Sequence, residues 1–277
     1  MKLYHTRKGL LLESEEAYYL LEQDWDGLLN TENLFAALVA ICESTAPIEN
    51  YREILEKDVL PPVKSQEIWA SGVTYFNSKM ERQKESEKAG GGIFYEMVYH
   101  AERPELFFKS TPQRAIGSGQ KVRIRKDSTW DVPEPELTLV INNNAQIVGY
   151  TIGNDMSSRS IEGENPLYLT QAKVYDGSAA VGPCVLVTAE PFSLERAISL
   201  TIFRKGATVF HESILLSQMK RTPEDLVSYL YRECSFPLGC LLMTGTGIIP
   251  STDFTLQSQD EIHIHIEGIG TLINEVA

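Results

Sequence analysis

WDVPEPELTLVI, residues 130–141, and AQIVGYTIGND, residues 145–155, decide how this chain folds. Both stretches carry apolar and β-branched residues in the alternation typical of strands. The three asparagines between them, residues 142–144, are typical of a turn. The sequence therefore predicts an antiparallel hairpin whose second strand returns over residues 145–153.

Three carboxylates are predicted to meet at the open end of this hairpin. Glu134 and Glu136 begin the first strand and project from one face, with their Cα atoms about 7 Å apart. If the turn closes symmetrically on residues 143–144, Glu134 lies opposite Gly153, and Asp155 follows two residues later. Because cross-strand partners share a face, Asp155 would join the two glutamates.

This acidic pattern has two interpretations. Three adjacent carboxylates repel one another unless a cation lies among them, and ligation by oxygen alone suits Mg²⁺, Mn²⁺ or Ca²⁺. Alternating acids are also common on the solvent-exposed face of an antiparallel sheet, where they bind nothing. The residues alone leave both interpretations open.

Composition restricts the class of protein. The chain has 277 residues, of which 43% are hydrophobic and 23% charged, as in ordinary globular proteins. Its net charge of −13 would repel nucleic acid, although a bound divalent ion with local Arg and Lys can still attract a small anion. The four cysteines have no CxxC spacing, which predicts reduced thiols. With no signal-peptide pattern and no apolar run long enough to span a bilayer, we expect a soluble cytoplasmic protein without membrane contacts.

The chain is predicted to have an α+β, mostly β fold in two parts. Residues 1–62 predict a small α/β region, including a helix with Thr31 as its N-cap and apolar residues at helical spacing after it. The boundary falls at Pro61-Pro62, because neither proline can donate a backbone hydrogen bond. Residues 63–277 carry short apolar runs broken by Gly, Pro and Asn, which predicts a β-rich domain.

Two segments of the second part are predicted to be helical. Residues 77–100 are highly charged and contain three consecutive glycines, residues 90–92, which indicates a helix followed by a joint. The segment is either a solvated surface excursion or a lid hinged at the glycines. Thr222 is a predicted N-cap, followed by Pro223 at the first helical position.

The motifs of the chain stand in the order of a known family. They are EPEL (134–137), GYTIGND with SR (149–155 and 158–159), KVYD with GP (173–176 and 182–183), TGTG (244–247) and IGTLINEV (269–276). On these motifs, the chain from about Trp69 to the C-terminus resembles the fumarylacetoacetate hydrolase family. The resemblance implies a C-terminal mixed β-roll, a homodimer or higher homo-oligomer, and a small 2-oxo acid as substrate.

The resemblance also assigns site residues. It implies that Glu134, Glu136 and Asp155 bind a divalent ion, usually Mg²⁺, with Mn²⁺ or Ca²⁺ as alternatives. Lys173 matches the active-site lysine, whose pKa burial and a nearby ion would lower, so that it could remove a proton next to a polarised carbonyl. An ordinary surface lysine is the alternative.

Two further positions match substrate-binding parts of the family. Arg159 matches an arginine that holds a carboxylate or orients Asp155. The family usually has an acid after this arginine, whereas Ser160 follows here. Thr246 and its flanking glycines match a loop that binds the distal end of the substrate, although a simple tight turn is an equal alternative.

One departure concerns the carbon–carbon bond hydrolases of the family. These carry a histidine and a glutamate that activate water, but Ser78 occupies the histidine position here, while Glu81 is present. A serine without an adjacent base deprotonates water poorly near neutral pH. Hydrolysis is therefore a less favoured reaction for this chain. Ser78 and Glu81 are expected to contact the substrate instead.

A narrower resemblance concerns the reaction itself. WASGVTY (69–75), AERPELFFK (101–109) and SRSIEGEN (158–165) resemble the branch of the family that dehydrates 2-keto-3-deoxy-pentonates. It implies that Glu105 is an acid or base of the site, with a surface acid as the alternative. We expect Mg²⁺-dependent dehydration to 2,5-dioxopentanoate, with removal of a C3 proton and loss of the C4 hydroxyl. The alternatives are an acylpyruvate hydrolase, an oxaloacetate decarboxylase, or a non-catalytic metal- or metabolite-binding protein.

Overall fold

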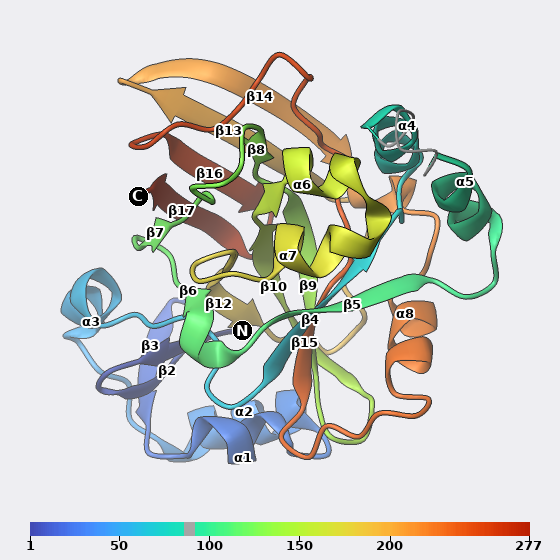
Figure 1. Ribbon diagram of the computed structural model, residues 1–277. Coiled ribbons are helices and arrows are strands. Elements are labelled where there is room, and N and C mark those ends of the chain that lie inside the picture. Colours follow the sequence, from blue (N-terminus) through green and yellow to red (C-terminus); the bar gives the residue numbers. More distant parts are fainter. Residues whose placement is uncertain (86–91) are drawn as a thin grey trace.

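The computed structural model describes residues 1–85 and 92–277, which form two large sheets, one small ladder and short helices (Figure 1). The larger sheet has the order β3-β2-β1-β12-β10-β9-β15-β4-β5, with β6 paired to β12. Its strands are β1 (Lys2–Thr6), β2 (Gly9–Ser14), β3 (Ala17–Leu21), β4 (Glu67–Gly72), β5 (Glu105–Ser110), β6 (Ala115–Ile116), β9 (Pro135–Ile141), β10 (Ile147–Asp155), β12 (Ala179–Leu186) and β15 (Cys240–Met243).

The second sheet has the order β14-β13-β16-β17-β7 and packs against one face of the first. Its strands are β7 (Lys121–Val122), β13 (Ala197–Arg204), β14 (Ala207–Leu215), β16 (Glu261–Ile266) and β17 (Gly270–Val276). A two-stranded ladder joins β8 (Asp131–Val132) to β11 (Ser157–Ser158). The predicted α+β, mostly β architecture is confirmed.

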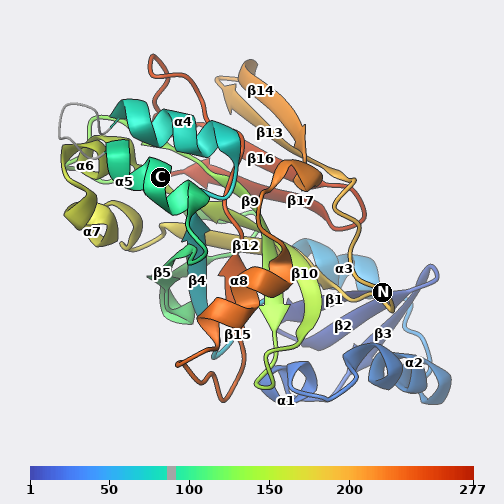
Figure 2. The same ribbon diagram turned by 90° about the vertical axis from the view of Figure 1, so that its right-hand side faces the viewer.

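Helices lie at both ends of the larger sheet. They are α1 (Trp25–Leu29), α2 (Leu34–Ser44), α3 (Tyr51–Lys57), α4 (Phe76–Glu85), α5 (Gly92–His100), α6 (Arg159–Glu164), α7 (Leu169–Lys173) and α8 (Pro223–Leu230), with 3₁₀ turns at Pro112–Arg114, Pro166–Tyr168 and Leu216–Gln218. Figures 1 and 2 show α1–α3 at one end of the molecule and α4–α7 grouped at the other. Within the described residues, no helix is both long and apolar enough to cross a membrane.

Strand β9 is the centre of the fold because it is buried on both faces. Leu137 and Leu139 pack into the core between the two sheets, whereas Val140 packs on the opposite face with Leu38 and the N-terminal helices. A strand buried on both sides needs apolar residues in succession, and LTLVI supplies them.

The β9–β10 hairpin forms as predicted, but its register differs by two residues. Gly153 pairs with Glu136 rather than with Glu134. The turn is longer than the symmetric one, since the Asn142 amide donates to Gln146 O at 2.9 Å, and a bulge follows between Ile147 and Gly149. Because strand side chains alternate with a period of two, the shift keeps every side chain on its expected face.

The helix predictions are partly correct. Helix α2 is capped by Asn33, whose side chain accepts from Ala36 N at 3.0 Å, so the assignment of Thr31 as N-cap was wrong. Only the residue directly before the helix reaches its first free amides, and Thr31 lies too far upstream. The N-cap at Thr222 is confirmed, because its hydroxyl accepts from Asp225 N at 3.1 Å.

The predicted boundary and lid remain predictions. Strand β1 pairs with β12, so the first three strands continue the larger sheet. The segment 77–100 contains most of helix α4 and all of helix α5. Of these two helices, only α4 corresponds to the predicted charged helix. The proposed hinge glycines at 90 and 91 lie outside the described residues, and Gly92 is the first residue of α5.

Candidate active site

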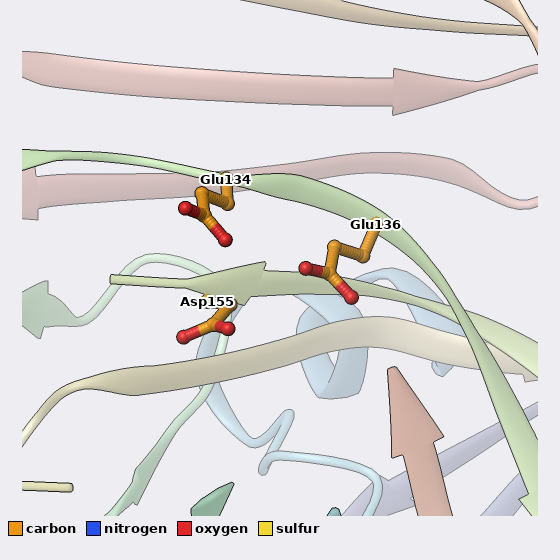
Figure 3. Close-up of side chains that lie close together, drawn as sticks. All are labelled: Glu134, Glu136 and Asp155. Atoms are coloured by element: carbon orange, nitrogen blue, oxygen red, sulfur yellow. The ribbon is translucent and has the colours of Figure 1, made fainter. Parts of the chain in front are cut away.

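The structure brings the three predicted carboxylates together at the open end of the β9–β10 hairpin (Figure 3). Asp155 N donates to Glu134 O at 3.0 Å, which sets these residues opposite each other. One oxygen from each of Glu134, Glu136 and Asp155 lies within 4.8 Å of the others. All three residues are at most 4% exposed, so the exposed-face interpretation does not apply to them.

Three buried cations surround these carboxylates. Lys173, at the end of α7, donates to Glu134 Oε2 at 2.7 Å, to Asp155 Oδ2 at 3.0 Å and to Ser157 Oγ at 2.6 Å. Arg159, the first residue of α6, donates to the other Glu134 oxygen at 2.6 Å. The Lys109 ammonium lies 2.5 Å from Asp155 Oδ1. The alternative of a surface position for Lys173 is wrong, because its side chain is fully buried.

Glu136 is held differently from the other two acids. It accepts a hydrogen bond of 2.6 Å from the Gly245 amide. Burial, followed by the charges of Asp155 and Glu134, raises the pKa of Glu136 well above its usual range. Gly245 has φ +93°, and a Cβ there would fall 2.0 Å from the Thr74 hydroxyl, so the close approach to Glu136 requires glycine.

These residues fit a divalent ion. The donor set is all oxygen, buried, and convergent from two adjacent strands, as Mg²⁺ requires. A high pKa at Glu136 is the expected property of crowded carboxylates without a metal among them. The trio Glu134, Glu136 and Asp155 is therefore suited to bind Mg²⁺.

A small cavity opens onto this cluster. Predicted residues that line it are Ser78, Glu134, Asp155, Arg159, Lys173 and Thr246. The two hydroxyls are engaged locally, because Ser78 Oγ donates to Tyr75 O at 2.8 Å and Thr246 Oγ1 donates to Ile248 O at 3.1 Å. Glu81 belongs to α4, but its side chain lies outside the described residues.

Glu105 lies at the edge of the cavity rather than among its lining residues. It begins β5 opposite Gly72, which lines the cavity, and its Oε2 occupies the space where a Cβ of Gly72 would stand. Glu105 shares a strand face with Phe107, another lining residue. The Glu105 carboxylate therefore borders the cavity, and glycine at position 72 makes room for it.

The family usually has an acid directly after the arginine that Arg159 matches, but the next residue in this chain is Ser160. Ser160 Oγ instead accepts from Thr129 N at 3.1 Å. One helical turn further on, buried Glu162 lies 3.8 Å from the Arg159 guanidinium. Arg159 is thus placed between Glu134 and Glu162, which fixes its direction.

Two polar residues of the cluster were not predicted. Ser157 accepts from Lys173 Nζ, and Lys109 contacts Asp155. Lys109 lies where the pairing of β4 with β5 shifts, between Phe108 and Ser110, so strand alternation alone does not indicate it. No sequence signal separates Ser157 from an ordinary serine.

A mostly β fold that buries three carboxylates beside a lysine and an arginine defines a candidate divalent-metal enzyme. Residues 67–277 match the sequence model described as "Fumarylacetoacetate (FAA) hydrolase C-terminal". The chain therefore belongs to the fumarylacetoacetate hydrolase family.

Curated relatives are similar over most of their length. A "Probable 2-keto-3-deoxyxylonate dehydratase" of Haloferax volcanii is 47% identical over 225 residues, covering 80% of this chain and 76% of the relative. The "2-dehydro-3-deoxy-D-arabinonate dehydratase" of Saccharolobus solfataricus is 43% identical over 225 residues, covering 79% of this chain and 74% of the relative.

A solved structure extends the likeness to the whole chain. It is a 2-keto-3-deoxy-D-arabinonate dehydratase complexed with magnesium and 2,5-dioxopentanoate. It has a TM-score of 0.84 and 34% identity, and the match covers 100% of this chain and 98% of that chain. The predicted β-roll of the fumarylacetoacetate hydrolase type is thereby confirmed.

Proposed function

We propose that this protein is a Mg²⁺-dependent hydro-lyase that dehydrates a 2-keto-3-deoxy-pentonate to 2,5-dioxopentanoate. The observation that carries the proposal is the contact of Lys173 Nζ with two of the three carboxylates suited to a metal. A base and a metal site in contact suit removal of a proton next to a carbonyl. The likeness to two dehydratases of related sugar acids supports this reaction.

The charges of the site suit a 2-oxo acid. Counted in their ionised forms, the side chains of Lys109, Arg159 and Lys173 offset the charges of the three carboxylates. A bound Mg²⁺ would bring two further positive charges, polarise the 2-oxo group and offset the negative charge that develops as the C3 proton leaves. The Arg159 guanidinium at the cavity wall would bind the substrate carboxylate.

The elimination uses two side chains. Lys173 in its neutral form takes the C3 proton, and the electron pair of that C–H bond becomes the C3–C4 double bond. The C4–O bond breaks, and Glu105 in its protonated form gives the hydroxyl the proton that makes it water. Transfer of a proton from C5 to C3 moves the double bond to C4–C5 and gives an enol. The proton of the C5 hydroxyl then passes to C4, which turns the enol into the aldehyde of 2,5-dioxopentanoate.

The reaction is tested by product analysis. Purified protein with Mg²⁺ is incubated with 2-keto-3-deoxy-arabinonate and, separately, with 2-keto-3-deoxy-xylonate, and mass spectrometry follows the product. We expect a product lighter than substrate by one water, carrying an aldehyde, and no product after removal of metal by a chelator. Pyruvate release from acylpyruvates or oxaloacetate without dehydration of either sugar acid would overturn the proposal. Tight binding of these acids without any turnover would also overturn it.

The role of Glu105 has a matched pair of tests. Glu105→Gln removes the acid, and Gly72→Ala puts a Cβ where the Glu105 carboxylate lies. Both variants should lose about 10²-fold or more in kcat while Mg²⁺ affinity stays unchanged. Glu105→Gln with normal kcat would assign the protonation of the hydroxyl to another group.

The hydrolase alternative has less support. Ser78 stands at the position of the histidine, and its hydroxyl forms hydrogen bonds with the Tyr75 backbone. We further infer a cytoplasmic protein that forms homo-oligomers. Light scattering after size-exclusion chromatography tests the second point, and a monomer at all concentrations would refute it.

A further inference from the structure

Among the residues that the structure describes, the most deeply buried cation without an assigned role is Lys109, the last residue but one of β5. Its ammonium group lies 2.5 Å from Asp155 Oδ1 and donates to Met156 O at 3.0 Å, and it also donates to the backbone carbonyl of Lys173. An ammonium has three N–H donors; here two of them bond backbone carbonyls, and a carboxylate oxygen of Asp155 lies beside the same nitrogen. With acceptors of the protein on several sides of its nitrogen, Lys109 is placed to hold these groups together.

The three oxygens belong to the two segments that must be aligned for the proposed reaction. Asp155, the proposed metal ligand, ends β10 and Met156 follows it, whereas Lys173, the proposed base, ends α7. Lys109 reaches both from a third segment, β5. With Oδ1 of Asp155 held by Lys109, the other oxygen, Oδ2, faces Lys173 at 3.0 Å.

We propose that Lys109 is a positioning residue that orients Asp155 for the metal and fixes the distance between that ligand and Lys173. The inference rests on the proposed metal site, because it concerns one of its ligands. It does not depend on which 2-oxo acid is the substrate. Lys109 itself touches no reacting atom in this proposal, since its nitrogen contacts oxygens of the protein.

Two substitutions separate positioning from simple charge balance. Lys109→Arg keeps the positive charge, but a planar guanidinium cannot direct donors to three oxygens that converge on one point. Lys109→Met keeps the aliphatic stem and removes the charge. If Lys109 only balanced charge, its removal would leave the carboxylates more negative, and Mg²⁺ would bind more tightly to Lys109→Met.

The test measures Mg²⁺ affinity by calorimetry on the substrate-free protein, with thermal melting as the check of folding. We expect Lys109→Arg to bind Mg²⁺ on the order of tenfold more weakly and to lose kcat with little change in KM. Lys121→Met is the matched control, because it removes a lysine from the exposed pair with Glu275. It should leave all these quantities unchanged.

Two outcomes would overturn the inference. One is Lys109→Arg with the Mg²⁺ affinity and kcat of the unmodified protein, which would make the geometry of Lys109 irrelevant. The other is tighter Mg²⁺ binding by Lys109→Met, which would assign it charge balance alone. If Lys109→Met does not fold, Lys109→Arg still decides. Mg²⁺ binding without turnover of sugar acids by the unmodified protein would defeat the proposed reaction and leave this test intact.

Discussion

The two ends of one face of β9 differ in what they bury. Val140 belongs to the apolar cluster that includes Leu38 and other residues of the N-terminal helices, whereas Glu136, on the same face, is one of six buried ionisable groups that lie together. Burial of apolar surface stabilises a fold by about 25 cal/mol per Å². Burial of ionised groups costs desolvation energy that even good ion pairs hardly recover. One end therefore maintains the fold, and the other is retained for its chemistry.

The same contrast separates the first 62 residues from the rest of the chain. Thr6 is the one buried polar side chain in residues 1–62, while the region from Gln66 onward buries Lys109, Glu134, Arg159 and Lys173. The family match begins at residue 67, and within the described part of the chain every buried charged side chain lies after that residue. If this division holds, substitutions at the charged end change turnover and metal affinity, and substitutions at the apolar end change stability alone.

The largest effect on turnover is expected for Lys173→Met. Loss of the base should lower kcat by about 10³-fold or more. Mg²⁺ should bind at least as tightly as before, because Lys173 no longer competes for Glu134 and Asp155. Steady-state kinetics and calorimetry measure the two quantities. Lys57→Met, at an exposed i,i+4 pair with Glu53, is the control. Residual turnover near that of the control would exclude Lys173 as the base.

A smaller effect on turnover at saturating metal is expected for Glu134→Gln. The amide keeps the shape but loses the charge that Arg159 and Lys173 now contact. Mg²⁺ affinity should fall on the order of 100-fold. This loss should be at least as large as the loss caused by removing a residue that only supports a metal ligand, because Glu134 is expected to be a ligand itself. Turnover should recover in part as Mg²⁺ is raised. Calorimetry and activity at increasing Mg²⁺ check this, and unchanged affinity would remove Glu134 from the metal site.

The sequence predicted which residues lie at the charged end of β9 better than it predicted how those residues are arranged. The three carboxylates were found because strand alternation has a period of two, so a register error of two residues still left Glu134, Glu136 and Asp155 on one face. The error itself has two sources: the turn is longer than the symmetric one, and a bulge follows it.

Contacts between distant segments were beyond the reach of the sequence. Lys109 lies 46 residues before Asp155, and only the pairing of strands in the larger sheet brings them together. A local pattern reveals which face a side chain shares, but not which chain segment that face will meet. For the same reason, the sequence did not reveal that the missing side chain of Gly72 leaves room for the Glu105 carboxylate.

A still smaller effect is expected from pH, through Glu136. Its raised pKa means that the metal-free folded protein holds a proton there more tightly than the unfolded chain does. This contribution to stability is fully present below the ordinary glutamate pKa of 4.5 and is lost as pH rises through the raised pKa. Mg²⁺ must displace that proton, so its affinity should increase with pH across the same interval.

Calorimetry in buffers of different ionisation enthalpy measures both the affinity and the proton released. Glu136→Gln should bind Mg²⁺ weakly and with no proton release in this interval. If the unmodified protein releases no proton on binding Mg²⁺, Glu136 is not the ligand that competes with protons.

The smallest effect on turnover is expected at the apolar end. Leu38 is fully buried in α2, so Leu38→Ala should cost about 2–5 kcal/mol of unfolding free energy through lost burial and a cavity. Val39→Ala, at the next residue and 38% exposed, is the control and should cost well under 1 kcal/mol. Urea unfolding gives the free energies. The kcat of both variants should equal that of the unmodified protein, because Val140 and Glu136 contact different neighbours along β9. A fall in kcat for Leu38→Ala under conditions where it is fully folded would mean that β9 transmits packing changes to the carboxylates, and that the two ends are not independent.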